Sequence, residues 1–183
     1  DLQGRTCDLA FQEGIQNQNA QNVYEFNYNY PDEHQIRKVK LMRDECAFDN
    51  AKKDNSFSAF RDFIEHYPNA IQSKKAEQFI YKLAFNEILD SEDYQSFLQY
   101  YKRYPNSPYR SAAHDKYEYL LYKEITQSGT LDSYLSFIER YPENNYRSEA
   151  IQMAINTGAE SNDFVQLLET LKMLGDFGSM NKI

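Results

Sequence analysis

The chain has 183 residues, of which 41 % are hydrophobic and 26 % are charged, so it has enough apolar material for a core and is not a disordered tail. Its net charge of −8 disfavours nucleic acid and anionic lipid as partners, because an acidic surface repels their phosphates. Only 6 glycines and 5 prolines occur, which favours helices over a β-sandwich. The sequence contains no apolar run of about 18 residues that could cross a membrane.

The first predicted element is a helix within residues 1–15. Ala10-Phe11 stands 37 residues before Ala47-Phe48, so this segment aligns with the second helix of the hairpin that follows it. The chain is therefore expected to open on a second helix that lacks its first helix. Either a longer parent protein or a divergent capping helix would complete that hairpin.

A Tyr-Pro pair then recurs along the chain at a constant interval of 37 residues. The four pairs begin at Tyr30, Tyr67, Tyr104 and Tyr141. Because proline cannot continue a helix and restricts the residue before it, each pair predicts the end of a helix followed by a turn. A fixed period of this length is typical of repeat proteins.

Apolar residues precede each Tyr-Pro pair at helical spacing. The positions four, seven and ten residues before the tyrosine predict the inward stripe of a helix of about 12 residues. Nine residues after the tyrosine comes a small residue, which we expect where two helices approach closely. The residues four before the tyrosine are Phe26, Phe63, Tyr100 and Phe137, and those seven before are Val23, Phe60, Phe97 and Tyr134. Ten before stand Ala20, Phe57, Tyr94 and Leu131. Nine after stand Val39, Ala76, Ala113 and Ala150.

Capping residues are predicted at the helix starts. Ser107, which is followed by a proline, is expected to cap the second helix of the third unit. That helix is expected over residues 108–127, with Gly129 as its breaker. The first helices of the hairpins are expected to be capped by Ser56, Ser91 and Thr130.

Each unit is thus predicted to be an antiparallel helix hairpin, and one hairpin alone cannot bury its aromatic stripe. Stacked hairpins would bury the stripes continuously, so the sequence predicts an all-α fold, an α-solenoid with a 37-residue repeat. We expect one domain over residues 1–178 and a flexible tail at 179–183. The expected parts of the domain are a partial repeat at 1–15, repeats at 19–55, 56–92, 93–129 and 130–160, and a terminal helix at 161–175.

The stretch "YPNSPY" from Tyr104, followed by Ala113, resembles the tetratricopeptide-like superfamily. Its nearest likeness is to bacterial outer-membrane assembly lipoproteins and Tol-Pal-associated periplasmic proteins. The similarity covers most of residues 19–160, with a period of 37 rather than the common 34. The resemblance implies a right-handed superhelix that binds proteins in the periplasm or at the outer membrane, with a lipid anchor outside this chain as a compatible feature. A cytoplasmic location is the alternative.

The cysteines and histidines of the sequence do not indicate a metal site or a catalytic site. Cys7 and Cys46 have no metal-binding spacing, and we favour two buried thiols over a disulfide, which needs Cα atoms within about 7 Å. His34, His66 and His114 occupy different positions of the repeat, which disfavours a shared metal site. We therefore expect no catalytic residues, no metal and no cofactor.

Cationic residues near the helix ends are the candidate partner-binding residues. The residue before the tyrosine is His66, Arg103 or Arg140 in the last three units, and stacked arginines could bind acidic groups or the C-terminus of a partner. The alternative is a local role, because cations stabilise helix C-termini. The full candidate set is Arg61, His66, Lys102, Arg103, Arg110, Arg140 and Arg147.

Three classes of function remain open on these observations. The favoured one is a scaffold that binds a peptide or protein segment along the solenoid groove, in a bacterial envelope complex. The second is a structural spacer or oligomerisation segment of a larger protein. An enzyme is the least favoured, because the inward columns are apolar and no phosphate-binding or nucleophile motif occurs. The sequence does not specify the partner or the oligomeric state.

Overall fold

Seven helices make up the described part of the chain, and no strand occurs in it. The computed structural model describes residues 33–160 together with 165, 168, 169 and 172, with side chains within 40–159 and at those four positions. An all-helical fold is therefore confirmed for these residues. Other predicted parts lie outside them, namely the partial repeat at 1–15, the first helix of the repeat at 19–55, most of the terminal helix at 161–175, and the tail at 179–183.

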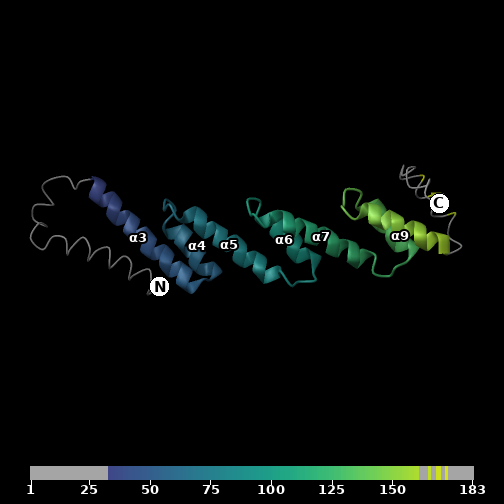
Figure 1. The fold of residues 1–183 in the computed structure, drawn as a ribbon, viewed down its shortest axis with the longest axis horizontal. Helices are drawn as coiled ribbons and strands as arrows, with labels where there is room; N and C mark the ends of the chain where they lie inside the picture. The colour runs from purple at the N-terminus through teal and green to yellow at the C-terminus, as the bar shows by residue number, and fades with distance from the viewer. Residues whose placement is uncertain (1–32, 161–164, 166–167, 170–171, 173–183) are drawn as a thin grey trace, which may run out of the picture. The chain divides into compact units, whose positions relative to one another are not determined.

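The helices belong to two units, Asp1–Glu87 and Ile88–Ile183, and the prediction of one domain over residues 1–178 stays a prediction. Figure 1 labels most of the helices in chain order. The first unit holds α3 (Glu33–Asp54), α4 (Phe57–His66) and nearly all of α5 (Ser73–Ile88). The second holds α6 (Tyr94–Arg103), α7 (Arg110–Ile125), α8 (Leu131–Arg140) and α9 (Arg147–Glu160). None of the described helices is long and apolar enough to span a membrane.

The helices α4, α6 and α8 each end at the residue before a Tyr-Pro pair, as predicted, and each contains ten residues, fewer than the expected number of about 12. In the second of these turns the Tyr104 N–H still donates to the Tyr100 carbonyl, at 3.0 Å. Tyr104 itself leaves helical geometry, with φ −120° and ψ 69°, because proline follows it. The Ser107 N–H then donates to the Tyr104 carbonyl at 3.1 Å and closes the turn. The turns after Tyr67 and Tyr141 contain the same two hydrogen bonds.

Two of the predicted helix caps are present. The Ser56 hydroxyl accepts a hydrogen bond from the Ala59 N–H at 3.1 Å and begins α4. The Thr130 hydroxyl accepts one from the Ser133 N–H at 3.3 Å and begins α8. Both side chains satisfy amide groups that the first turn of a helix leaves without intrahelical partners.

The cap predicted at Ser91 is wrong, because α6 is capped by Asp93. The Asp93 carboxylate accepts from the N–H groups of Gln95 and Ser96, at 2.9 and 3.2 Å. The Ser91 hydroxyl instead accepts from the Asp93 N–H at 3.1 Å and orders the residues before the helix. A carboxylate at this position has two acceptor oxygens and carries the charge that a helix N-terminus favours.

The cap predicted at Ser107 is also wrong. The helix α7 begins at Arg110, later than expected, and its N-cap residue Tyr109 makes no side-chain capping bond. Ser107 is 8 % exposed, and its hydroxyl lies 2.7 Å from the hydroxyl of Tyr100 and accepts from the Tyr109 N–H. Tertiary packing of the turn therefore takes this serine away from helix capping. At the other end, Gly129 follows the helix with φ +64°, a conformation that suits glycine.

Aromatic packing joins the three helices of the first unit. Phe48 of α3 lies 5.4 Å from Phe63 of α4, measured between ring centroids, and Phe60 of α4 stacks on Phe79 of α5 at 4.6 Å. Phe48, Phe60 and Phe63 are each at most 4 % exposed. The predicted inward stripe is thus buried at its last two positions, whereas Phe57 at its start is only half buried.

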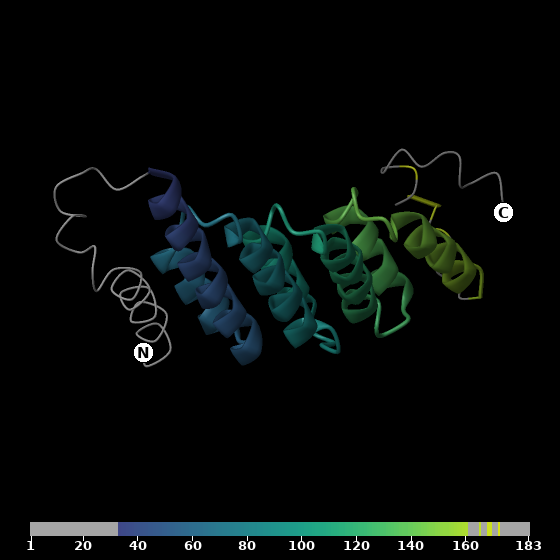
Figure 2. The same cartoon turned by 60° about the vertical axis from the view of Figure 1, so that its left-hand side comes forward.

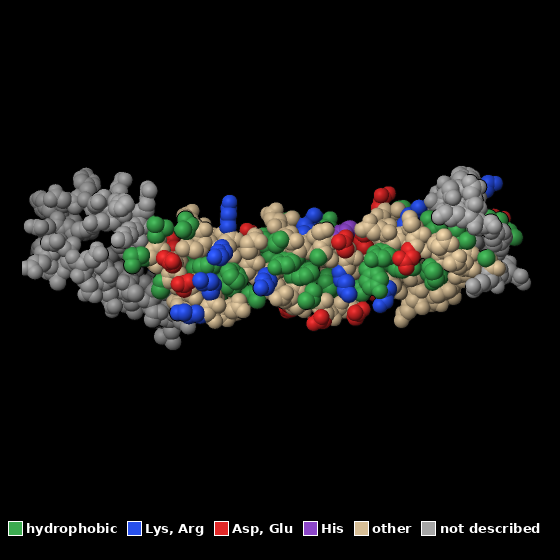
Figure 3. Space-filling view, viewed as in Figure 1, with side chains coloured by type: hydrophobic (Ala, Val, Ile, Leu, Met, Phe, Trp, Pro, Cys, Tyr) green, Lys and Arg blue, Asp and Glu red, His purple; other side chains and the backbone are tan. Residues whose placement is uncertain are grey.

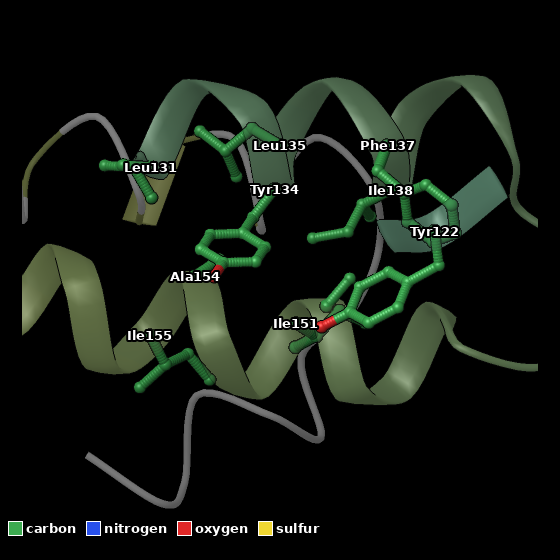
Figure 4. Packing of buried hydrophobic residues seen from close by; sticks show 10 residues of the cluster. Tyr122, Leu131, Tyr134, Leu135, Phe137, Ile138, Ile151, Ala154 and Ile155 are labelled. Atoms are coloured by element: carbon green, nitrogen blue, oxygen red, sulfur yellow. The ribbon is translucent and has the colours of Figure 1, made fainter. Parts of the chain in front are cut away.

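One cluster of buried residues in the second unit lies mainly between α8 and α9 and includes one residue of α7. Figure 4 shows Tyr134 and Ile138 of α8 facing Ile151 of α9, with Tyr122 of α7 at one end. The Tyr122 ring meets Phe137 edge-on at 5.2 Å and so attaches α7 to α8. In Figure 2, α6 lies beside α7 and α8 beside α9.

The predicted column of small residues is buried wherever the structure describes it. Ala76, Ala113 and Ala150 each have 0 % exposed surface, near the starts of α5, α7 and α9. A side chain without atoms beyond Cβ lets the two helices of a hairpin approach closely. The burial of this column is therefore confirmed for these three residues, and the close approach of the helices there stays a prediction.

The predicted burial of Cys46 is wrong, because this residue is exposed on α3. The buried face of α3 carries Asp44, Phe48 and Ala51, which are spaced by four and three residues. A residue two positions before Phe48 lies about 200° around the helix and points away from that face. Cys7 lies outside the described residues, so the pairing of the two thiols stays a prediction.

Candidate partner-binding surface

The two arginines that end α6 and α8 each lie over the following tyrosine. The guanidinium carbon of Arg103 is 5.5 Å from the centroid of the Tyr104 ring, and that of Arg140 is 5.9 Å from the Tyr141 ring. Both arginines are exposed. The cation–π contact restricts each guanidinium group while leaving its N–H donors accessible.

The first unit contains the two candidates on α4. His66 is exposed, its Nδ1 lies 2.7 Å from the Asp62 carbonyl oxygen, and its ring centroid is 6.5 Å from that of Tyr67. Arg61 is 64 % exposed, and its Nε lies 3.8 Å from the Asp62 carboxylate. Both side chains thus have local partners on the same helix, and a salt bridge at such exposure is weak.

Arg110 joins the start of α7 to α6. Its guanidinium carbon lies 3.9 Å from the centroid of the Tyr101 ring, and its Nε donates to the Tyr101 carbonyl oxygen at 3.4 Å. This side chain is half buried and has a structural role within the hairpin. Arg147 occupies the equivalent position at the start of α9 and is also half buried.

Four of the candidate cations have no carboxylate within 4.0 Å among the described residues, although the chain carries 28 acidic and 20 basic residues. Other cations pair closely, as Lys52 does with Asp49 at 2.7 Å. Three of the four are exposed and the fourth is half buried, so their donors can reach an anion from outside the chain. The four are Lys102, Arg103, Arg110 and Arg140.

Aromatic side chains also lie beside other cations at the surface of α7. Figure 3 shows one face on which hydrophobic side chains, a class that includes tyrosine here, reach the surface beside Lys and Arg side chains over α6 and α7. Tyr119 on α7 is 37 % exposed and has Lys116 and Lys123 within 5.9 and 5.5 Å of its ring centroid. A mixture of rings and cations is typical of surfaces that bind proteins.

A buried carboxylate on α7 was not singled out by the sequence analysis. Glu118 is 6 % exposed, and its Oε2 accepts a hydrogen bond from the backbone N–H of Asn145, 27 residues away, at 3.3 Å. Its Oε1 lies 3.9 Å from Nε2 of His114. The glutamate therefore attaches α7 to the turn between α8 and α9. The residues 37 positions before and after Glu118 are Tyr81 and Ile155, and both are buried. A charged residue between two uncharged residues of the same repeat position was therefore the sequence signal that could have identified Glu118.

Burial raises the pKa of several tyrosines. The pKa of Tyr122 rises to about 12, first because burial disfavours the phenolate and then because the negative charge of Glu149 is near. Burial is also the largest cause of the raised pKa values of Tyr100, Tyr117 and Tyr146. These phenols therefore stay protonated near neutral pH and are not suited to act as bases there. Among the described residues, no group of three His, Cys, Asp or Glu side chains is placed to hold a metal ion.

No family of known proteins and no curated protein matches this chain.

Proposed function

We propose that this chain is a tetratricopeptide-like scaffold that binds a peptide or protein segment along the groove of an α-solenoid. The observation that carries the proposal is the shared construction of α4, α6 and α8. These helices begin at Phe57, Tyr94 and Leu131, which are 37 residues apart, and end in turns with the same hydrogen bonds. Repeated hairpins of this kind bury one side of each helix and present the other at regular intervals, which suits extended binding.

The exposed ends of α6 and α8 are the proposed contact region. Lys102, Arg103 and Arg140 are exposed there, with no carboxylate within 4.0 Å among the residues that the structure describes. Guanidinium groups bind carboxylates with two parallel hydrogen bonds, so a partner could place acidic side chains or its C-terminus here. The proposed location, a bacterial envelope complex in the periplasm or at the outer membrane, rests on the resemblance of the stretch "YPNSPY".

Capture of partners from native extract with two matched variants tests the proposal. The test variant is Arg103→Glu/Arg140→Glu, and the control is Lys74→Glu/Lys82→Glu on α5, where both lysines are exposed. Each variant reverses two charges, so the net charge is the same in both. Helical content is compared by circular dichroism, which separates loss of binding from loss of folding.

The proposal predicts a specific partner that wild type and control retain and that the Arg103→Glu/Arg140→Glu variant loses by about tenfold or more. A partner retained equally by all three proteins would place binding elsewhere and contradict this contact region. No specific partner would contradict the scaffold proposal and favour a spacer or oligomerisation segment. Light scattering would then distinguish those two, because only the second predicts self-association.

A further inference from the structure

At four equivalent positions, the hairpins α6–α7 and α8–α9 carry different types of side chain. In α8–α9 they carry aliphatic side chains that are at most 7 % exposed, and Figure 4 shows them within the core between the two helices. In α6–α7 they carry aromatic side chains with polar tips that are only half buried. The pairs, each separated by 37 residues, are Tyr94 and Leu131, Tyr101 and Ile138, His114 and Ile151, and Tyr117 and Ala154.

These four side chains of α6–α7 form a continuous row, which we call the aromatic row. The ring centroids of Tyr101 and His114 are 4.7 Å apart, those of His114 and Tyr117 are 5.9 Å apart, and those of Tyr117 and Tyr94 are 6.1 Å apart. Arg110 stands over Tyr101 at the end of the row, with its guanidinium carbon 3.9 Å from the ring centroid. Packing alone does not require polar tips here, because aliphatic residues fill the same positions in α8–α9.

The polar tips of the aromatic row offer several hydrogen-bond donors, and the tyrosine hydroxyls and the imidazole of His114 can also accept. The hydroxyl groups of Tyr94, Tyr101 and Tyr117 make no hydrogen bond to any residue that the structure describes. The guanidinium group of Arg110 has donors only. The carboxylate of Glu118, which lies 3.9 Å from Nε2 of His114, is buried and accepts from the Asn145 N–H, so it is not presented to a ligand.

We infer that the aromatic row is a docking site for a proline-rich protein segment in the polyproline II conformation. This inference rests on the proposed scaffold function and specifies a class of partner for it. Proline rings pack well on aromatic rings, and a proline-rich backbone has carbonyl oxygens but few N–H groups. The partial negative charge of those carbonyls complements the donors of the tyrosines and of Arg110. An oligosaccharide, whose hydroxyl groups both donate and accept, is the competing ligand that the test must exclude.

Fluorescence anisotropy with the full chain and a labelled peptide of about nine prolines, roughly 28 Å long, tests the inference. The variant Tyr101→Ile/His114→Ile/Tyr117→Ala introduces the residues that α8–α9 carries at these positions, so we expect it to fold. Tyr101→Phe/Tyr117→Phe retains the rings and removes two donors. Met153→Ala is the control, because this exposed methionine of α9 lies outside the row. A glycine-serine peptide of equal length and a linear maltooligosaccharide are the control ligands.

We expect the wild type to bind the proline peptide and not the two control ligands. The aliphatic variant should weaken this binding by about tenfold or more, and the phenylalanine variant by about fivefold. The control should stay within about twofold of wild type. Absence of proline-peptide binding, equal binding by the aliphatic variant, or binding of the oligosaccharide alone would overturn the inference. Those results would leave the scaffold proposal standing, because its own test is loss of a native partner on charge reversal at Arg103 and Arg140.

Discussion

The hydroxyl groups of Tyr100 and Ser107 lie 2.7 Å apart, and both residues are buried between the end of α6 and its turn. At the same two positions the preceding hairpin pairs Phe63 with Ala70, both of which are buried. In these two hairpins a hydroxyl group on the helix accompanies a hydroxyl group in the turn, and a plain ring accompanies a methyl group. The third hairpin pairs Phe137 with Asn144, whose side chain accepts from the Tyr146 N–H instead. The two positions are expected to contribute to stability as a pair.

A double-mutant cycle measures this coupling. Ser107→Ala removes a buried partner of the Tyr100 hydroxyl and an acceptor for the Tyr109 N–H, so we expect a loss of about 1–3 kcal/mol in the free energy of unfolding. Tyr100→Phe should cost about 1 kcal/mol. The double variant should lose less than the sum of the two, by about 1 kcal/mol. Urea unfolding of the four proteins gives these values, and strictly additive losses would contradict the pairing.

Replacement of Ala113 by leucine tests the close approach of α6 and α7. Ala113 has 0 % exposed surface, so the larger side chain must displace its neighbours, and we expect a loss of about 1–3 kcal/mol in stability. Ala112→Leu is the matched control, because this neighbouring alanine is exposed and its replacement should change stability by about 0.5 kcal/mol or less. Thermal unfolding compares the two, and equal shifts in Tm would show that the column tolerates large residues.

The contact between Glu118 and the Asn145 N–H predicts local protection from hydrogen exchange. Glu118→Ala should speed exchange of the Asn145 amide and cost about 1–3 kcal/mol of stability, because a buried acceptor is lost. Glu118→Gln should have a smaller effect, since its amide oxygen can still accept. Exchange measured by NMR checks this, with Glu124→Ala at an exposed position of α7 as the control. An unchanged exchange rate in Glu118→Ala would contradict the contact.

The raised pKa of Tyr122 predicts a loss of stability at alkaline pH. The unfolded residue loses its proton near pH 10, whereas the folded one does so at about 12. The stabilisation is therefore fully present below about pH 10 and is lost as the pH rises through about 12. Urea unfolding from about pH 9 to about pH 12 should show a shallower decline for Tyr122→Phe than for wild type. The control Tyr119→Phe should follow wild type, and identical curves for all three proteins would refute the assignment.

The local pattern of the sequence was sufficient to predict the helices and several of their ends. Proline restricts the residue before it, so the ends of α4, α6 and α8 follow from the Tyr-Pro pairs alone. The caps at Ser56 and Thr130 follow in the same way, because each directly precedes an apolar helical stripe. At Ser91 the pattern failed because Asp93, two residues later, caps α6 instead.

Features that depend on tertiary contacts could not be predicted from local patterns. Ser107 looks like a helix cap in sequence, but the hydroxyl of Tyr100 places it inside the turn. Glu118 looks like one of many solvated carboxylates until Asn145, 27 residues away, is seen to donate to it. The aromatic row was visible as a change from aliphatic to aromatic residues. Its continuity depends on how α6 and α7 pack, which spacing alone does not specify.

Site-specific photocrosslinking in native cells tests the central claim, that a partner protein occupies the exposed ends of α6 and α8. A benzoylphenylalanine residue is placed at Lys102, or at Lys82 on α5 as the control, since both lysines are exposed. The account predicts a discrete crosslinked product of higher mass with a protein partner at position 102 and none at position 82. No crosslink at position 102, or the same product at both positions, would contradict it.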